Sequence, residues 1–179
     1  SSPFSLIIVD DGSDEPTRDY LRQFSESTKN CTLIRNEQAL GYTRAANVGM
    51  RASQSTILCL LNSDTIVTPE WLDRLYRALT RENNIGVVGP LSNTASWQSI
   101  PKLSDNGDWA VNSLPEGITK KEMGKLIAKY SACIHPDVPL LNGFCLMIRK
   151  ELIDGIGYFD EVNFGQGYGE EDDFNLRAA

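Results

Sequence analysis

The chain has 179 residues, of which 41% are hydrophobic and 23% are charged, and its formal net charge is −7. This length allows one domain with a substantial core. The negative charge argues against nonspecific binding to nucleic acid, which needs basic patches. No apolar stretch approaches the roughly 20 residues that a membrane-spanning helix needs.

Strand and helix patterns alternate through the first half of the chain. An apolar run over 5–9 predicts a buried strand, because it is short and closes on acidic and small residues. The further segments that we expect are helices over 14–27 and 41–53 and from Pro69 onward, and strands over 31–34, 57–61 and 85–88. This order predicts a three-layer α/β/α domain with a mostly parallel central sheet.

Residues 91–140 differ from the rest of the chain, because Ser, Asn, Asp, Gly and Pro dominate them up to Gly117. We interpret this segment as an excursion from the sheet near the site, with an amphipathic helix over 119–130. A strand pattern returns over 140–148. Residues 154–169 predict a glycine-rich loop, and a helix begins at Glu170. We therefore expect residues 1–179 to form a single domain, truncated at both ends.

Carboxylates follow two of the predicted strands. The first strand runs into Asp10-Asp11-Gly12-Ser13, and the strand over 57–61 runs into Asn62-Ser63-Asp64. In open α/β sheets ligands bind beyond the carboxyl ends of the strands, so Asp11 and Asp64 are expected on the same edge of one sheet. There they could contact a nucleotide and hold a divalent metal. The alternatives are an Asx turn for the first segment and a helix cap for the second.

Four adjacent acids, Glu170-Glu171-Asp172-Asp173, stand between a glycine-rich segment and Phe174. Their mutual repulsion raises the pKa of at least one carboxyl group, which suits a general base acting on a hydroxyl group near neutral pH. The alternative is a solvated helix N-terminus, where the helix dipole favours acids.

The four cysteines, Cys31, Cys59, Cys133 and Cys145, are widely spaced and form no CxxC pair. Two of them, Cys59 and Cys145, lie in apolar runs. This usage favours reduced core thiols and a cytosolic setting over a disulfide framework.

Taken in order, these motifs resemble the family 2 glycosyltransferases, nucleotide-sugar-dependent enzymes of the GT-A fold. The resemblance is closest to bacterial enzymes that extend surface polysaccharides, such as O-antigen or rhamnose-containing glycans. The matching segments are LIIVDDGSDEPT, NEQALGYTRAANVGM (36–50), LCLLNSDTIVTPEWL (58–72), GVVGPLSN (86–93), LNGFCLMIRKELIDGIGYFDE (141–161) and GYGEEDDFNLRA (167–178). They cover most of the chain outside 94–140. The family's first strand is missing from the segments matched here.

The resemblance implies a nucleotide site and a metal site. Asp11 would hydrogen-bond the nucleotide base or ribose. Asn62-Ser63-Asp64 stands where the family has an Asp-x-Asp motif, so Asp64 would bind Mn or Mg beside the diphosphate, assisted by Asn62. Asn62 replaces the leading acid of that motif, and a neutral ligand weakens metal binding.

The resemblance also implies an acceptor site and a base. The residues that would border the sugar and the acceptor are Asn93, Asn142 and Gly143. Glu170-Glu171 stands where the family has a Glu-Asp pair whose second member is the base. Glu171 is therefore the base candidate, Glu170 would bind the acceptor, and Asp172 remains a rival base because Glu171 is one methylene longer than the family's Asp.

The activity that the resemblance implies is inverting transfer of a sugar from a nucleotide-diphosphate-sugar to a glycan or lipid-linked acceptor. The expected location is the cytoplasm, with membrane proximity through segments outside this chain. Two alternatives stay open. One is a nucleotidyltransferase, which predicts a glycine-rich phosphate-binding loop with Lys or Arg after the first strand; no such loop is visible there. The other is a noncatalytic nucleotide- or glycan-binding domain.

Overall fold

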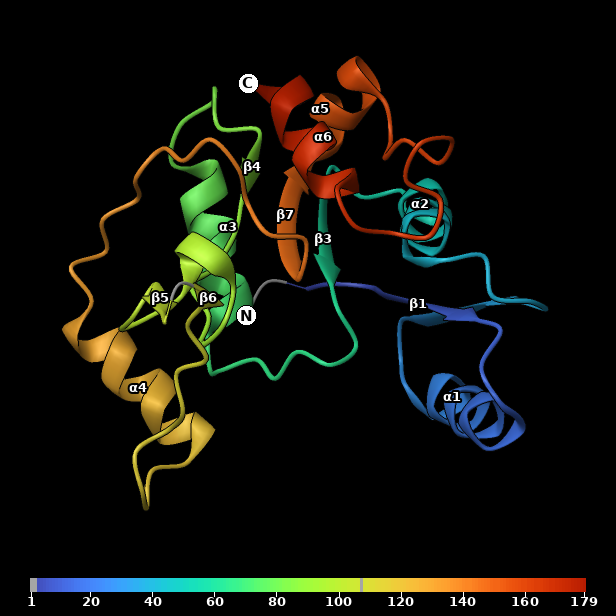
Figure 1. Ribbon diagram of the computed structural model, residues 1–179. Coiled ribbons are helices and arrows are strands. Elements are labelled where there is room, and N and C mark those ends of the chain that lie inside the picture. The colour runs from blue at the N-terminus through green and yellow to red at the C-terminus, as the bar shows by residue number, and fades with distance from the viewer. Residues whose placement is uncertain (1–2, 107) are drawn as a thin grey trace. The chain divides into compact units, whose positions relative to one another are not determined.

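The computed structural model describes residues 3–106 and 108–179 (Figure 1). These residues fall into two compact units, each described here by itself. One unit comprises Cys59–Ile148, and the other comprises 3–58 together with Arg149–Ala179. The chain passes from one unit to the other within strand β3, and it returns within strand β7.

The unit that contains both ends of the described chain is built around a parallel pair of strands. Its elements are β1 (Leu6–Asp11), α1 (Glu15–Ser27), β2 (Cys31–Asn36), α2 (Tyr42–Ala52), α5 (Lys150–Ile156) and α6 (Glu170–Ala178). β1 pairs with β2 from Leu6 opposite Cys31 to Asp11 opposite Asn36. The strands and helices that the sequence predicts over residues 5–53 are confirmed, to within two residues at each end.

Local sequence signals explain helices α1 and α2. The side chain of Asp14 accepts a hydrogen bond from the backbone nitrogen of Thr17 at 3.1 Å, which caps the N-terminus of α1. Pro16 occupies the first turn, where its missing N–H costs nothing. α2 packs closely on β1, because a Cβ at Gly49 would lie 3.3 Å from the Val9 side chain.

The predicted start of the loop over 154–169 is wrong, because α5 continues to Ile156 and the loop begins after it. Gly155 lies inside this short helix and breaks the sequence periodicity that would have revealed it. Gly157 then ends the helix with a φ of 89°, a conformation that favours glycine. The predicted helix from Glu170 is confirmed as α6.

The other unit carries a three-stranded sheet in the order β3-β7-β4. Its elements are β3 (Ile57–Leu61), α3 (Trp71–Thr80), β4 (Val87–Val88), the 3₁₀ turn η1 (Ser96–Gln98), β5 (Ser104–Asp105), β6 (Asp108–Trp109), α4 (Lys120–Tyr130) and β7 (Cys145–Arg149). β4 runs antiparallel to β7. The core of this unit includes Leu75, Leu79 and Leu146.

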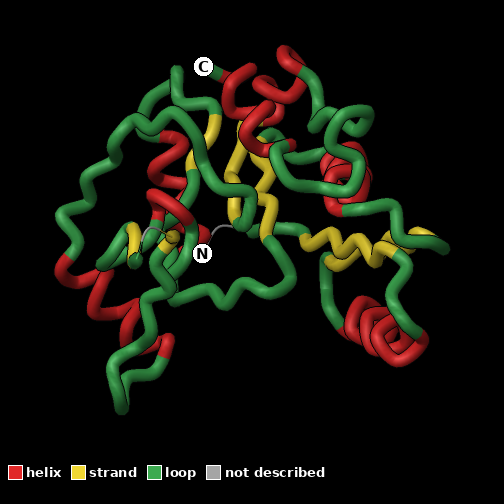
Figure 2. The backbone as a smooth tube through the Cα atoms, in the orientation of Figure 1, coloured by secondary structure: helices red, strands yellow, loops and turns green. Residues whose placement is uncertain are grey.

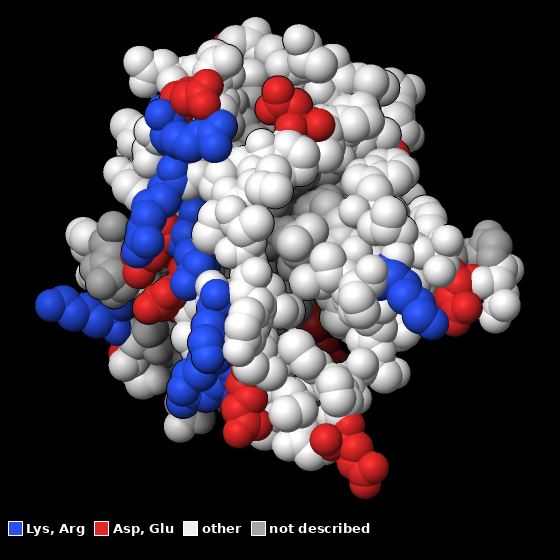
Figure 3. Space-filling view, turned by 90° about the vertical axis from the view of Figure 1, so that its left-hand side faces the viewer, with Lys and Arg blue, Asp and Glu red and all other residues white. Residues whose placement is uncertain are grey.

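Residues 91–140 are mostly loop (Figure 2), as the sequence predicts. Their helix α4 begins with a capping box in which Thr119 and Glu122 exchange hydrogen bonds. No described residue of α4 is buried, and its lysines are exposed. Lys and Arg side chains gather in a band on the face shown in Figure 3.

Among the described residues, no helix combines the length and the hydropathy that crossing a bilayer requires. The described strands form separate hydrogen-bonded ladders, in which β1 pairs with β2 and β3 pairs with β7. The common sheet edge expected for Asp11 and Asp64 therefore stays a prediction.

Candidate functional site

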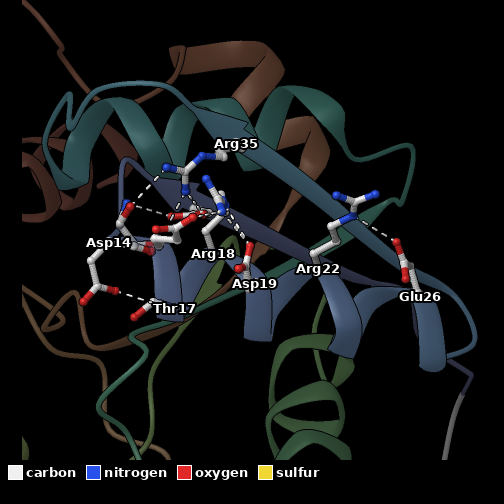
Figure 4. A network of polar contacts seen from close by, with 10 residues as sticks. Asp14, Thr17, Arg18, Asp19, Arg22, Glu26 and Arg35 are labelled. Carbon is white, nitrogen blue, oxygen red and sulfur yellow. Dashed lines mark hydrogen bonds and ion pairs between the residues drawn. The ribbon is translucent and has the colours of Figure 1, made fainter.

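The loop after β1 is fixed by a buried ion pair. Asp10, 3% exposed, pairs with Arg35 of β2 and accepts a hydrogen bond from the backbone nitrogen of Ser13 at 3.0 Å. Arg35 also donates to the backbone oxygen of Ser13 at 3.0 Å. Arg35 lies beside the N-terminal half of α1 in Figure 4. Burial raises the pKa of Asp10, but the hydrogen bonds from Ser13 and Arg35 outweigh it, so the pKa lies below its usual value.

The hydrogen-bond partners of Asp11 differ from those of Asp10 and lie in the segment before α2. Its carboxylate accepts hydrogen bonds from the side-chain nitrogen of Asn36 at 2.7 Å and from the backbone nitrogens of Leu40 and Gly41, both at 2.9 Å. These donors hold the loop that leads into α2. A carboxylate has about four acceptor positions, so most of those on Asp11 are already used within the protein. Sequence reasoning missed this structural task.

Two glycines make this arrangement possible. Gly12 has a φ of 73°, and a Cβ there would lie 2.5 Å from the backbone nitrogen of Ala39. Gly41 has a φ of 93°, and a Cβ there would lie 2.4 Å from the backbone oxygen of Gly165. Any side chain at either position would displace backbone. The two loops that surround Asp11 therefore depend on glycine.

The candidate metal ligands lie in the other unit, directly after β3. Asn62 is held by its backbone, whose nitrogen donates to the oxygen of Phe144 at 2.9 Å. Its side-chain Oδ1 is buried and has no hydrogen-bond partner among the described residues. Asp64 is exposed. A buried amide oxygen without a partner and an exposed carboxylate are both hard oxygen donors, so these residues fit Mg²⁺ or Mn²⁺.

Few protein ligands are available to such an ion. Within residues 3–106 and 108–179, no group of three or more His, Cys, Asp and Glu side chains could hold a metal. Mg²⁺ and Mn²⁺ sites often use one or two protein oxygens and complete the shell with water and substrate phosphates.

The structure brings Asn93 and Asn142 into one cluster of loops around η1. The backbone nitrogen of Asn142 donates to Oε1 of Gln98 at 2.6 Å, and its side chain donates to the oxygen of Ala95 at 3.1 Å. The backbone oxygen of Asn93 accepts from the side chain of Asn112 at 2.9 Å. Gln98, 5% exposed, organises this cluster and was missed by sequence reasoning, because nothing in its neighbourhood marks it as buried.

The four acids of α6 have different environments. Glu170 is 4% exposed, and its Oε2 has no hydrogen-bond partner within the part of the chain that the structure describes. Burial, and then the negative charges of Glu171 and Asp172, raise the pKa of Glu170. Burial and the charge of Glu171 likewise raise the pKa of Asp172. Asp173 instead pairs with Arg177 one turn along the helix, at 2.8 Å.

Glu171, the base predicted from the sequence, is half-buried. Among the described residues, its Oε2 accepts a single, long hydrogen bond, 3.3 Å, from the backbone nitrogen of Gly169. Gly169 has a φ of 104° and a Cβ there would lie 2.9 Å from the ring of Phe164, so this turn is also specific to glycine. Glu171 thus keeps acceptor capacity for a proton from a substrate.

The sulfur atoms of Cys59 and Cys145 lie within hydrogen-bond reach on the neighbouring strands β3 and β7. The Cys145 thiol donates a hydrogen bond to Cys59, and this bond, followed by burial, raises the pKa of Cys145. All four cysteines are free in the structure. The side chain of Cys133 alone among them is exposed.

Comparison with known proteins identifies the family. A model described as Glycosyl transferase family 2 matches residues 1–157. The chain is 26% identical to a chondroitin synthase of Escherichia coli over 97% of this chain and 27% of that protein. It is 32% identical to the glycosyltransferase AglE of Haloferax volcanii over 88% of this chain and 46% of that protein. The chain thus spans less than half of either relative.

Two solved structures show the same fold. A mannosyltransferase from Pyrobaculum calidifontis, in complex with GDP-Man and Mn²⁺, has a TM-score of 0.57 and 16% identity over 94% of this chain and 40% of that one. GalNAc-T7, with UDP, GalNAc and Mn²⁺, has a TM-score of 0.63 and 15% identity over 97% of this chain and 34% of that one. This chain belongs to glycosyltransferase family 2 and has a partial GT-A fold.

Proposed function

We propose that the protein transfers a sugar from a nucleotide-diphosphate-sugar to an acceptor hydroxyl group, with inversion at the anomeric carbon. The observation that carries the proposal is the family match over residues 1–157, together with the buried, unpartnered Oδ1 of Asn62 in the position of the metal motif. Solved relatives of this fold contain a nucleotide or nucleotide-sugar and Mn²⁺, which supports a donor of this class.

Asn62 and Asp64 would hold the divalent cation, either Mn²⁺ or Mg²⁺. When bound, the ion supplies neutralising positive charge for the diphosphate leaving group. Of these two ligands, Asp64 would supply an exposed carboxylate and Asn62 would supply its neutral, buried amide oxygen. The Asn at this position lowers the charge of the site by one relative to two carboxylates, so donor phosphates contribute a larger share of the binding.

Glu171 would act as the general base. Its carboxylate takes the proton from the acceptor hydroxyl group as that oxygen attacks the anomeric carbon, and the bond to the nucleoside diphosphate breaks. The base needs an unprotonated oxygen with free acceptor capacity, and Glu171 has only one long hydrogen bond, 3.3 Å, to Gly169. Glu170, whose pKa burial raises, holds a proton to higher pH and would donate a hydrogen bond to an acceptor oxygen.

Asp11 would contact the nucleotide through the acceptor positions that the loop leaves open. Its three donors, Asn36, Leu40 and Gly41, hold the carboxylate in a fixed orientation before the nucleotide binds. A prepositioned group loses little freedom on binding, which favours affinity. Asn93, Asn142 and Gly143 would border the sugar and acceptor. The acceptor class we propose is a glycan or a lipid-linked glycan, with the donor drawn from the cytoplasm.

The experiment is a panel of nucleotide-sugars (UDP-GlcNAc, UDP-galactose, GDP-mannose and dTDP-rhamnose) tested with the purified protein, with and without Mn²⁺. A donor at about 100 times its Kd stabilises the folded state by about 2.7 kcal/mol. That gain raises Tm by roughly 5–10 °C for a chain of this size. Each donor that binds is then assayed for release of its nucleoside diphosphate. Binding without release or transfer would identify a noncatalytic domain, and stabilisation by none of the donors would contradict the proposal.

A further inference from the structure

The side chain of Asn47 is buried and hydrogen-bonds both backbone polar groups of one residue, Phe159. Asn47 lies in the middle of α2 and is 0% exposed. Its Nδ2 donates to the backbone oxygen of Phe159 at 2.9 Å, and its Oδ1 accepts from the backbone nitrogen of Phe159 at 3.1 Å. The same Nδ2 donates to Oε1 of Glu161 at 2.8 Å. The side chain of Asn47 in α2 thus hydrogen-bonds the loop backbone at Phe159 in the way that a neighbouring β-strand would.

The loop that Asn47 holds is attached to α6 on its other side. The ring of Phe159 packs edge-on against Phe174 of α6, with centroids 5.4 Å apart and an interplanar angle of 89°. Arg177 of α6 donates to the backbone oxygens of Ile156 at 2.7 Å and of Tyr158 at 3.0 Å. Phe159 and Phe174 are 3% and 0% exposed. Residues 156–159 are therefore clamped between α2 and α6.

Glu161 strengthens the α2 side of this clamp. It accepts from Arg51, one turn after Asn47, at 2.8 Å. The hydrogen bonds from Asn47 and Arg51 lower the pKa of Glu161, so the pair with α2 is charged at neutral pH. All these residues belong to the unit of 3–58 and Arg149–Ala179. The contacts therefore run without interruption from α2 to the helix that carries Glu171.

We propose that Asn47 is a positioning residue, which sets the orientation of the first turn of α6 and hence of Glu171. The proposal rests on the proposed function, in which Glu171 is the base. No other side chain of the same length both donates to a peptide oxygen and accepts from the peptide nitrogen of one residue: Asp lacks the donor, and Leu lacks both groups. A displacement of about 1 Å at a reacting group can cost on the order of a hundredfold in rate.

The test compares N47L with M50A in the full chain. Leu has the same number of side-chain heavy atoms and the same branching as Asn47, is larger, and makes none of its three hydrogen bonds. Met50, on the same helix and also 0% exposed, is the control, because M50A leaves a cavity in the core and keeps the three hydrogen bonds of Asn47. N47D is the second variant, for use if N47L does not fold, since it keeps the acceptor for the Phe159 nitrogen and loses both donations.

Two readouts are needed. Hydrogen exchange followed by mass spectrometry should show faster exchange over 156–161 and 170–178 in N47L, and not in M50A, with α1 unchanged in both. For a donor that the panel identifies, kcat should fall by tenfold to a hundredfold in N47L, while the donor Kd changes by less than about twofold. M50A should keep the kcat of the folded wild type.

Unchanged exchange over 170–178 in N47L would overturn the proposal, and so would increased exchange with an unchanged kcat. An equal loss of kcat in M50A would show a general effect of stability and would overturn it as well. A wild-type protein that binds and turns over no donor marks the failure of the proposed function instead. The exchange data then still decide whether Asn47 orders α6.

Discussion

Replacing Arg35 with Met should destabilise the protein through the carboxylate that it leaves behind. The Asp10 side chain is 1% exposed and that of Arg35 is 24% exposed, so the pair is largely removed from water. In R35M the buried charge loses its ion-pair partner and keeps the hydrogen bonds from Ser13, of which the one from the backbone nitrogen is 3.0 Å long. Removing one partner of a buried ion pair costs about 3–5 kcal/mol. The partial exposure of Arg35 admits some water, and we expect a loss of about 3 kcal/mol.

The assay is urea unfolding of R35M and wild type at a series of pH values, with R22M as the matched control. The pKa of Asp10 is lowered in the folded wild type, so its contribution to stability is present above the unfolded value of 3.8 and is lost as pH falls through the folded pKa. R35M lacks this contribution, so the difference between R35M and wild type should shrink below about pH 4.

The control variant, R22M, removes an arginine from a solvent-exposed ion pair. Arg22 pairs with Glu26 at 3.2 Å across one turn of α1, and their side chains are 75% and 67% exposed (Figure 4). Exposed pairs of this kind contribute little, and R22M should leave the free energy of unfolding unchanged. If R35M costs no more than R22M at pH 7, or if its cost does not change with pH, the argument from the buried pair is wrong.

Three further predictions follow from the site. D64A should raise the Mn²⁺ concentration needed for donor stabilisation by at least about tenfold, measured by thermal shift; an unchanged requirement would remove Asp64 from the metal site. E170Q should be more stable than wild type at pH 7 and equal to it at pH 4. Burial raises the pKa of Glu170, so the folded wild type loses stability as rising pH ionises this carboxyl group. Urea unfolding at both pH values checks this, and a less stable variant at pH 7 would contradict it. In the folded protein a maleimide should label the exposed Cys133 at least about a hundredfold faster than Cys145, which is 1% exposed and has a raised pKa. Peptide mass spectrometry measures both rates. Comparable labelling would mean that Cys145 in β7 is accessible to the reagent.

The sequence was sufficient for elements that carry strong local signals. The helix expected over 41–53 is α2, and its Gly49 lies against Val9 of β1. The amphipathic helix expected over 119–130 is α4 (Lys120–Tyr130). These signals act within a few residues, so no knowledge of the fold was needed to find them.

The rest depended on contacts between distant residues. The segment 150–156 forms α5, which Gly155 concealed. Asn47 and Phe159 are 112 positions apart, and nothing local marks either as half of a hydrogen-bonded pair. The same holds for Asp11, whose partners include Leu40 and Gly41 on another loop. Family resemblance identified residue types at the site, but the tertiary contacts determine what each oxygen is free to do.

The four acids of α6 illustrate the same limit. Their spacing predicted a base among them, and it did not distinguish their environments. Glu170 is buried, Asp173 is paired with Arg177, and Glu171 retains acceptor capacity. The match to the family model ends at residue 157, so the base assignment rests on the sequence motif and on these environments.

The base assignment is tested most directly by turnover of E171Q on the donor and acceptor that the panel identifies. The matched control is E151Q, the same substitution at an exposed acid in the first turn of α5. We predict that E171Q binds the donor with Mn²⁺ as the wild type does and transfers sugar at least a hundredfold more slowly, while E151Q keeps the wild-type rate. Sugar transfer by E171Q at the rate of E151Q would contradict the central claim.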